Sequence, residues 1–298
     1  MTRGESREAQ NPTGGAARER ESDHGIRRIV VALDASTDSW TALEAAARMA
    51  SRLGAELLGL LVEDVNVRRI ADLPFVQEVG FFTASCRRVE TRELSRQLDV
   101  QAGRVRRQFQ TSTRSLQTRC TFRVVRGRVA LEVLAAAATA DVVILGKGAW
   151  SPFKTGHLTP AVRQVLSQSS TSTLVLREDT RVEPPMRVVY DGTALGEKAL
   201  ATAAGLARDD GGQLMVFLLA DGPDEAARLR DAVRQRLAGQ LLEISFQSLT
   251  ERSVPRLAHL IAHEEGGTLV MPAGTGALED ETVLEFLDAT RVPVLLVR

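Results

Sequence analysis

The chain has 298 residues, 44% of them hydrophobic and 26% charged, and its formal net charge at pH 7 is zero. These values are typical of a globular protein, and no apolar run approaches the ~18 residues that a membrane-spanning helix needs. A domain averages roughly 150 residues, so this length predicts two domains.

The N-terminal segment and the cysteine content bear on location. Residues 1–25 mix charged residues with Gly, Pro and Ser and contain no apolar stretch of the kind that a secretory signal requires. We predict a disordered tail there. Cys86 and Cys120 are the only cysteines, too few for a disulfide framework. Both observations favour the reducing cytoplasm.

Short apolar runs alternate with amphipathic patterns from residue 26 onward. RRIVVALD, residues 27–34, is too short for a helix and ends in an Asp-containing turn, which predicts a buried strand. A helix capped by Ser36 or Ser39 and ended by Gly54 follows. Further strands are expected at residues 56–62, 121–127, 141–146 and 172–177, and helices at 129–138 and near 160–168.

A longer excursion separates the second of these strands from the third. It predicts a loop around Pro74 and then a helix with one apolar side and one side rich in arginine. The apolar side carries Leu94, Leu98, Val105 and Phe109.

The same pattern then starts again. Residues 179–185 are charged and contain two prolines, which predicts a linker. MRVVYDGT, residues 186–193, repeats the first strand and its aspartate. Further strands are expected at 213–219, 243–249, 268–272 and 293–298, and helices at 195–208, 224–240, 254–264 and near 281–289.

Two copies of one element order indicate an internal duplication. Alternating strands and helices predict a mainly parallel sheet with helices on both faces. The expected fold class is therefore α/β, with two doubly wound, mainly parallel five-stranded sheets in tandem. The first domain is expected at residues 26–178 and the second at 186–298.

The charge is divided unequally between the two parts. Residues 26–178 contain 22 basic and 14 acidic residues, whereas 179–298 contain 12 basic and 19 acidic, which gives net charges near +8 and −7. Opposite charges favour docking of the two domains as an intrachain pseudo-dimer, to which the Arg-rich helix could add contacts. A further homodimer and an unidentified protein partner stay open, and no membrane contact is expected.

Several motifs resemble those of the universal stress protein family. RRIVVALDAS with its Ala-rich helix, then VVILGKG and an apolar closing strand, resemble it across residues 26–178. MRVVYDGT, TLVMPAG and RVPVLLVR resemble it again across 186–298. The resemblance implies a Rossmann-like fold of the adenine-nucleotide alpha hydrolase type and a regulatory or binding role in the stress response, without catalytic residues. It also suggests pairing of the domains through strands 172–177 and 293–298.

ATP-binding members of that family carry a loop of the form Gly, two residues, Gly, nine residues, Gly, then Ser or Thr. Here the pattern falls on Gly146, Ala149, Thr159 and Pro160, so one glycine of three is kept. Pro160 has neither a backbone N–H nor a hydroxyl to offer a phosphate. We therefore expect a weakened or lost ATP site and no required cofactor. An ATP or adenine-nucleotide sensor, with slow hydrolysis, is the alternative.

A ligand site is nevertheless expected at the carboxyl ends of the strands, where such sheets bind ligands. By resemblance, Asp34 and Val62 would flank an adenine and Gly146 would lie on the phosphate side. Lys147 and Lys154 are two of the three lysines of the chain and could bind phosphate as point charges. The candidate binding residues are Asp34, Val62, Gly146, Lys147, Gly148, Ala149, Lys154 and Thr159.

The second part is expected to bind no ATP. Asp280 and Glu281 stand where the family has Gly and Ser or Thr, and their carboxylates would repel phosphates. Asp191, the counterpart of Asp34, is interpreted as a turn residue.

Two other patterns in the sequence have alternative interpretations. His259 and His263 are four residues apart on an expected helix, a spacing that can hold a metal, but no further ligand is evident and no metal site is expected. An arginine cluster could contact nucleic acid, form a solvated helix face or contact the acidic second part. Without an aromatic platform or a recognition helix, nucleic acid is not the expected partner. The cluster comprises Arg87, Arg88, Arg92, Arg96, Arg104, Arg106, Arg107, Arg114, Arg119, Arg123, Arg126 and Arg128.

Overall fold

The computed structural model describes residues 26–66, 77–79, 86–88, 91–151, 156–249, 257–258, 260–261, 266–273 and 280–298. The strands of the first half are β1 (Arg28–Leu33), β2 (Glu56–Asp64), β3 (Gln77–Val79), β4 (Cys86–Arg88), β5 (Cys120–Gly127), β6 (Val142–Gly146) and β7 (Ser172–Leu176). Its helices are α1 (Thr37–Leu53), α3 (Thr91–Thr113), α4 (Val129–Ala137) and α5 (Pro160–Gln168). The short β3–β4 pair was not expected from the sequence, and the expected N-terminal tail lies outside the described residues.

The second half repeats the order of the main elements. Its strands are β8 (Met186–Tyr190), β9 (Gln213–Leu219), β10 (Glu243–Leu249), β11 (Thr268–Pro272) and β12 (Val294–Val297). Its helices are α6 (Ala194–Asp209), α7 (Pro223–Arg236) and α9 (Asp280–Ala289). Most of the helix expected at 254–264 lies outside the described residues, but 257–258 and 260–261 are helical.

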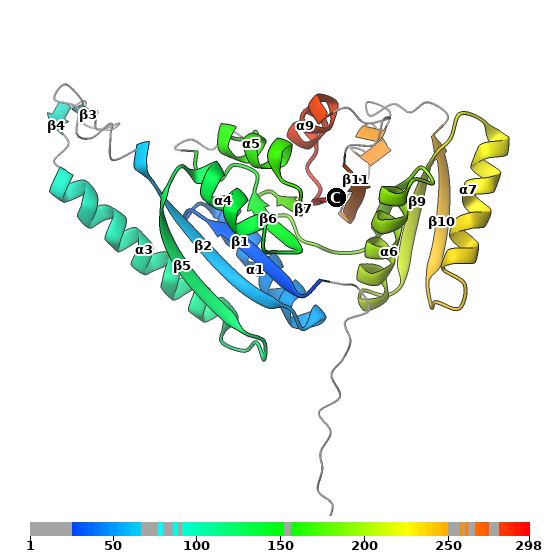
Figure 1. Cartoon of the computed structure of the whole chain (residues 1–298), viewed down its shortest axis with the longest axis horizontal. Coiled ribbons are helices and arrows are strands. Elements are labelled where there is room, and N and C mark those ends of the chain that lie inside the picture. The colour runs from blue at the N-terminus through cyan, green and yellow to red at the C-terminus, as the bar shows by residue number, and fades with distance from the viewer. Residues whose placement is uncertain are drawn as a thin grey trace, which may run out of the picture.

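Ten strands form one continuous sheet, in the order β10-β9-β8-β11-β12-β7-β6-β1-β2-β5 (Figure 1). When the strands are followed outward from the middle of this sheet, both halves have the same order. All pairs of this sheet within one half are parallel. The middle pair, β7 with β12, is antiparallel. The expected α/β fold with a mainly parallel sheet is confirmed, but the two expected five-stranded sheets are joined into one. They join because the two closing strands that the resemblance suggested, β7 and β12, do pair. The division into two domains at residues 179–185 stays a prediction.

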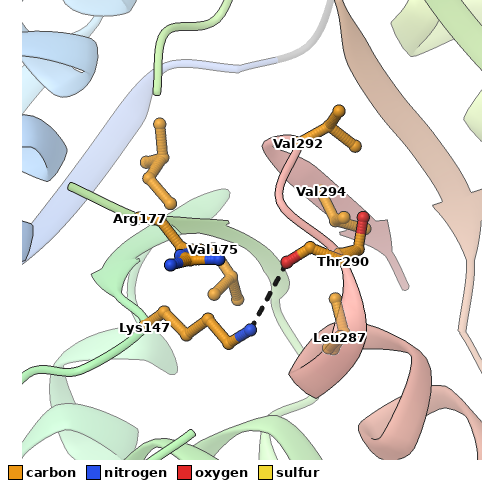
Figure 2. A pocket seen from close by; sticks show the side chains of 8 residues that line it. Lys147, Val175, Arg177, Leu287, Thr290, Val292 and Val294 are labelled. Atoms are coloured by element: carbon orange, nitrogen blue, oxygen red, sulfur yellow. Dashed lines mark hydrogen bonds between the residues drawn. The ribbon is translucent and has the colours of Figure 1, made fainter. Parts of the chain in front are cut away.

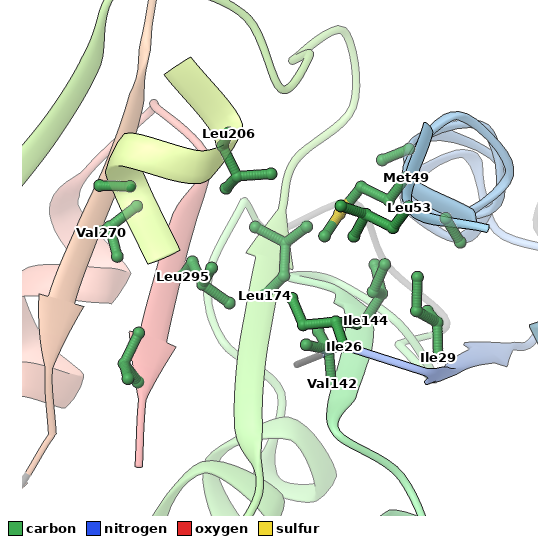
Figure 3. Close-up of a cluster of buried hydrophobic side chains, with 14 of the residues drawn as sticks. Ile26, Ile29, Met49, Leu53, Val142, Ile144, Leu174, Leu206, Val270 and Leu295 are labelled. Atoms are coloured by element: carbon green, nitrogen blue, oxygen red, sulfur yellow. The ribbon is translucent and has the colours of Figure 1, made fainter. Parts of the chain in front are cut away.

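Two hydrophobic cores cover the two faces of the sheet, because successive strand residues point to opposite faces. On one face Ile29, Val31 and Leu33 pack with helices α1, α3, α6 and α7. On the other, Val30 and Ala32 pack with α4, α5, α9 and residues 257–258 and 260–261. Each core continues across the β7–β12 junction. Figure 3 shows Leu174 of β7 next to Leu295 of β12, with side chains of both halves around them.

Charged contacts cross the junction on both faces. Arg52 at the end of α1 donates a hydrogen bond to Asp210, just after α6. The Arg298 guanidinium donates to the Ser169 and Leu166 carbonyls at the end of α5, and the Lys147 ammonium donates to carbonyls at the end of α9. Each half thus supplies a cation to the C-terminal end of the other half's last helix, where the helix dipole favours positive charge.

The suggestion that the Arg-rich helix contacts the acidic second half was wrong. Helix α3 packs beside β5, and β5 lies five strands away from β12 in the sheet order. With about 4.8 Å between neighbouring strands, that separation is about 24 Å. Figure 1 accordingly shows α3 at the far end of the sheet from β10 and α7. The pairing of the closing strands is the reason, since it puts the arginines at the opposite edge.

Local signals in the sequence explain where α1 begins and ends. The Ser36 hydroxyl accepts a hydrogen bond from the Ser39 N–H at 3.1 Å, as an N-cap does. Gly54 ends the helix with a φ of +64°, a conformation that glycine adopts without steric cost. The first turn of α1 therefore lies directly after the carboxyl end of β1. Within the described residues, no helix is both long and apolar enough to cross a membrane.

Candidate ligand site at the carboxyl ends of the strands

A cavity of about 340 Å³ opens at the carboxyl ends of β1 and β2. This volume lies within the usual range for small-molecule sites. Two of the predicted binding residues, Asp34 and Val62, line it. The other lining residues are Leu61, Glu63, Asp64, Leu98, Gln101, Trp150 and Ser151. The structure therefore brings the predicted adenine-side residues to one cavity, together with residues of α3 and of the loop after β6.

Asp34 fixes the position of that loop. Its carboxylate accepts hydrogen bonds from the backbone N–H of Ser36, at 2.9 Å, and from the backbone N–H of Trp150. Ala35, which lies between Asp34 and Ser36, and Trp150 both have positive φ, of 70° and 61°. Residues with side chains adopt this conformation at a cost of about 1–3 kcal/mol, and it persists where surrounding contacts hold it. The backbone next to Asp34 and at Trp150, two residues that line the cavity, is therefore held in a fixed conformation by the hydrogen bonds of the Asp34 carboxylate.

Asp38, in the first turn of α1, holds the other end of the loop. Its carboxylate accepts hydrogen bonds from the Gly148 N–H and the Glu178 N–H, each at 2.6 Å. A Cβ atom added at Gly146 would lie 2.7 Å from the backbone of Asp38, and one added at Gly148 would lie 2.5 Å from its carboxylate oxygen. Both glycines are thus required for close approach of Asp38. The Gly148 N–H, a possible phosphate donor, therefore already donates its hydrogen bond to the Asp38 carboxylate.

Lys147 points away from the loop and across the junction (Figure 2). Its side chain is buried, and its ammonium donates hydrogen bonds to the carbonyls of Asp288, at 2.5 Å, and Thr290, at 3.4 Å. Burial lowers the pKa of Lys147 to about 8; Arg177 and Arg163 add to the lowering, and the carboxylates of Asp288 and Asp38 partly oppose it. A phosphate would have to compete with the α9 carbonyls for this ammonium.

Asp288 is the counterpart of Lys147 on the other side of the junction. Its carboxylate accepts a hydrogen bond from the Leu158 N–H at 2.6 Å, lies 2.9 Å from His157 Nδ1 and 3.2 Å from the Arg163 guanidinium. Burial alone would raise the pKa of the Asp288 carboxyl, but these hydrogen bonds and the nearby positive charges lower it below its ordinary value. The segment 157–163 is therefore tied to α9 through one carboxylate.

The remaining predicted residues have structural contacts in this part of the chain. Thr159 caps α5: its hydroxyl accepts from the Val162 N–H at 3.4 Å and donates to the Ala149 carbonyl at 2.8 Å. Ala149 is fully buried. Pro160 is the first residue of α5, a position that needs no N–H donor. Lys154 lies outside the described residues, so its predicted contact with phosphate stays a prediction.

The second half has a different arrangement after its first strand. The Asp191 carboxylate accepts hydrogen bonds from the Thr193 N–H, at 3.0 Å, and the Thr193 hydroxyl, at 2.7 Å, which confirms Asp191 as a turn residue. The Tyr190 hydroxyl donates to Glu197 at 2.5 Å, and burial together with this carboxylate raises the pKa of Tyr190. In the part of the chain that the structure describes, no cluster of three His, Cys, Asp or Glu is placed to hold a metal. His259 and His263 lie outside that part.

Sequence reasoning missed four residues of this region: Asp38, Gln101, Trp150 and Asp288. The Gln101 side-chain amide donates to the Asp34 carbonyl at 2.7 Å, across 67 positions of sequence. Trp150, a bulky aromatic in a loop rich in small residues, was the one visible signal. The contacts of Asp38 and Asp288 join residues more than 100 positions apart, and no local sequence pattern predicts them.

A doubly wound α/β sheet with a ligand cavity at the carboxyl ends of its strands defines the class as Rossmann-like. Comparison with known families is more specific. The model of the universal stress protein family matches residues 25–177, and the chain belongs to this family.

Solved structures extend the likeness over both halves. A universal stress protein from Archaeoglobus fulgidus is 18% identical, with a TM-score of 0.65, and the alignment covers 90% of this chain and 95% of that one. A functionally unknown protein from Pseudomonas aeruginosa PAO1 is 16% identical, with a TM-score of 0.58 and coverage of 92% and 93%. At these identities the likeness concerns the fold. No curated protein matches the chain.

Proposed function

We propose that this chain is a binding or regulatory protein of the stress response whose first-half ATP loop is weakened. It acts by binding and not by catalysis, in the cytoplasm, with its two halves working as an intrachain pseudo-dimer. Family membership and the cavity at Asp34 and Val62 support a ligand-binding role. The second half contributes no ATP site, because Asp280 and Glu281 replace the family's small residues.

One observation supports the proposal that the ATP loop is weakened. The Gly148 and Trp150 amides, which would face a phosphate, donate to the chain's own carboxylates of Asp38 and Asp34. A phosphate at the same amides would have to displace a carboxylate and would be repelled by it, at several kcal/mol for charges about 4 Å apart at an effective dielectric constant near 20. The Lys147 ammonium, which donates a hydrogen bond to a carbonyl of α9, does little to offset this repulsion.

The direct test is to denature the purified full chain and measure released adenine nucleotide by mass spectrometry, and then to titrate ATP by calorimetry. We expect no stoichiometric nucleotide and weak or undetectable ATP binding. Stoichiometric nucleotide with tight ATP binding would instead support the alternative, an adenine-nucleotide sensor.

Removing the internal carboxylate should strengthen ATP binding. In Asp38→Ala the Gly148 amide is released and a negative charge is lost, so we expect ATP affinity to rise by about tenfold, which corresponds to about 1.4 kcal/mol. Calorimetry with wild type and variant measures it.

Asp141→Ala is the matched control for that variant. The Asp141 carboxylate also accepts from two backbone amides, those of Arg27 and Arg28, but at the amino end of β1. Its substitution should leave ATP affinity unchanged. Equal ATP affinity in wild type and Asp38→Ala, with both folded, would contradict the blocked loop.

A further inference from the structure

A second cavity adjoins the candidate ligand cavity along α3. Its volume is about 450 Å³. Gln101 lines both cavities, and its bond to the Asp34 carbonyl fixes it at the carboxyl end of β1. The other residues that line the second cavity are Ala35, Glu93, Arg96, Gln97, Val100 and Arg104. A ligand that extends past Gln101 would therefore pass from one cavity into the other.

The two cavities differ in charge. Three carboxylates line the first, those of Asp34, Glu63 and Asp64, and of these Glu63 is paired with the Arg126 guanidinium at 2.8 Å. The second cavity is lined by two guanidinium groups and one carboxylate, that of Glu93. Coulomb interactions would therefore repel an anionic group from the first cavity and attract it to the second, while carboxylates in the first cavity accept hydrogen bonds from N–H donors.

Arg96 and Arg104 supply the two guanidinium groups of the second cavity, both from α3. With Val100 they are spaced four residues apart, so they lie on one side of α3, and the two arginines are separated by about 12 Å along the helix. Both side chains are exposed, and within the described residues neither forms an ion pair. Guanidinium groups bind phosphate through paired hydrogen bonds.

We propose that Arg96 and Arg104 of α3 form the anion subsite for a ligand whose N–H-bearing ring, as in a purine mononucleotide, occupies the first cavity. The ring lies in the cavity of Asp34 and Val62, and the anion lies against Arg96 and Arg104. This inference rests on the proposed function, since the chain's own carboxylates fill the loop after β6 and the anion then needs positive charge from elsewhere, which Arg96 and Arg104 of α3 supply beside the cavity. The anion site has thus moved from the loop after β6 to helix α3.

The experiment compares AMP with adenosine, which differ by one phosphate. Calorimetric titration of the full-length wild type should give binding of AMP at least about tenfold tighter than binding of adenosine, the factor that charge-assisted hydrogen bonds supply. In Arg96→Gln/Arg104→Gln this preference should fall to about one, with adenosine affinity unchanged. Unchanged thermal unfolding of the variant verifies that it is folded.

The matched control is Arg107→Gln/Arg114→Gln, which removes the same charge from the same part of the chain but from residues that line neither cavity. It should keep the AMP preference, because the effect is local and does not follow from net charge alone.

The outcomes separate the two proposals. Wild type that binds neither compound, or both equally, overturns the anion site and leaves the weakened loop standing. An AMP preference that survives in Arg96→Gln/Arg104→Gln does the same. Tight, stoichiometric ATP in the purified wild type, insensitive to both arginines, overturns the anion site and the weakened loop together.

Discussion

Replacing Leu295 by alanine is expected to lower the free energy of unfolding by about 2–5 kcal/mol, the usual cost of a Leu→Ala substitution that leaves a cavity in a hydrophobic core. Leu295 is 1% exposed and pairs with Leu174 across the antiparallel junction of β12 and β7. Figure 3 shows both side chains in one cluster with Leu206 and Ile144, from the two halves. Denaturant unfolding followed by circular dichroism measures the change.

Leu241→Ala is the control for this substitution. Leu241 is 94% exposed, so its loss should change the free energy of unfolding by no more than about 0.5 kcal/mol. Unfolding of Leu295→Ala at the wild-type midpoint would show that the junction of the closing strands does not contribute to stability.

Asp288→Ala is expected to lower the free energy of unfolding by about 1.5–3 kcal/mol, the net contribution of hydrogen bonds to a charged group. The variant leaves the Leu158 N–H without its carboxylate acceptor and removes the contacts of His157 and Arg163 to α9. Denaturant unfolding at pH 7 measures it. Asp231→Ala is the control, because its ion pair with Arg234 at 3.7 Å is exposed and should contribute little.

The effect of Asp288 should depend on pH in a defined direction. The pKa of this carboxyl is lower in the folded chain than its ordinary value, so the folded state favours the ionised form. Its contribution is therefore fully present above the ordinary pKa of an aspartate, about 3.9, and is lost as the pH falls through the lower folded pKa. The stability difference between wild type and Asp288→Ala should shrink only below about pH 4. A difference that grows on acidification would contradict the assignment.

Much of the architecture could be predicted because it depends on local chemistry. Apolar runs such as RRIVVALD are too short for helices and are bounded by turn residues, so each predicts a buried strand, and Ser36 and Gly54 mark the two ends of α1. The repetition of this order predicted two five-stranded sheets of one type, which the structure joins into one ten-stranded sheet through β7 and β12. The family resemblance also named the two closing strands as the contact between the halves, and their apolar character agrees with it, because an apolar edge strand needs a partner.

The loop after β6 was only partly predictable. Its lost glycines are visible in the sequence, and they indicated a weakened ATP site at Gly146 and Ala149. The two lysines of the loop suggested that positive charge could replace the lost glycines in binding phosphate. The Lys147 ammonium instead donates hydrogen bonds to carbonyls at the end of α9. A loop without a regular period does not fix the directions of its side chains, so this outcome depended on packing against the other half.

The sequence by itself determined the elements, their repetition and the erosion of the glycine loop, since these follow from hydrophobic period, caps and residue type at short range. Only the tertiary structure decided which carboxylate meets which amide, where the arginines of α3 lie and how the two halves join. Asp38 reaches Gly148, and Asp288 reaches Leu158, across more than 100 residues. Such contacts form only when strand pairing brings distant segments together, and no short-range pattern encodes them.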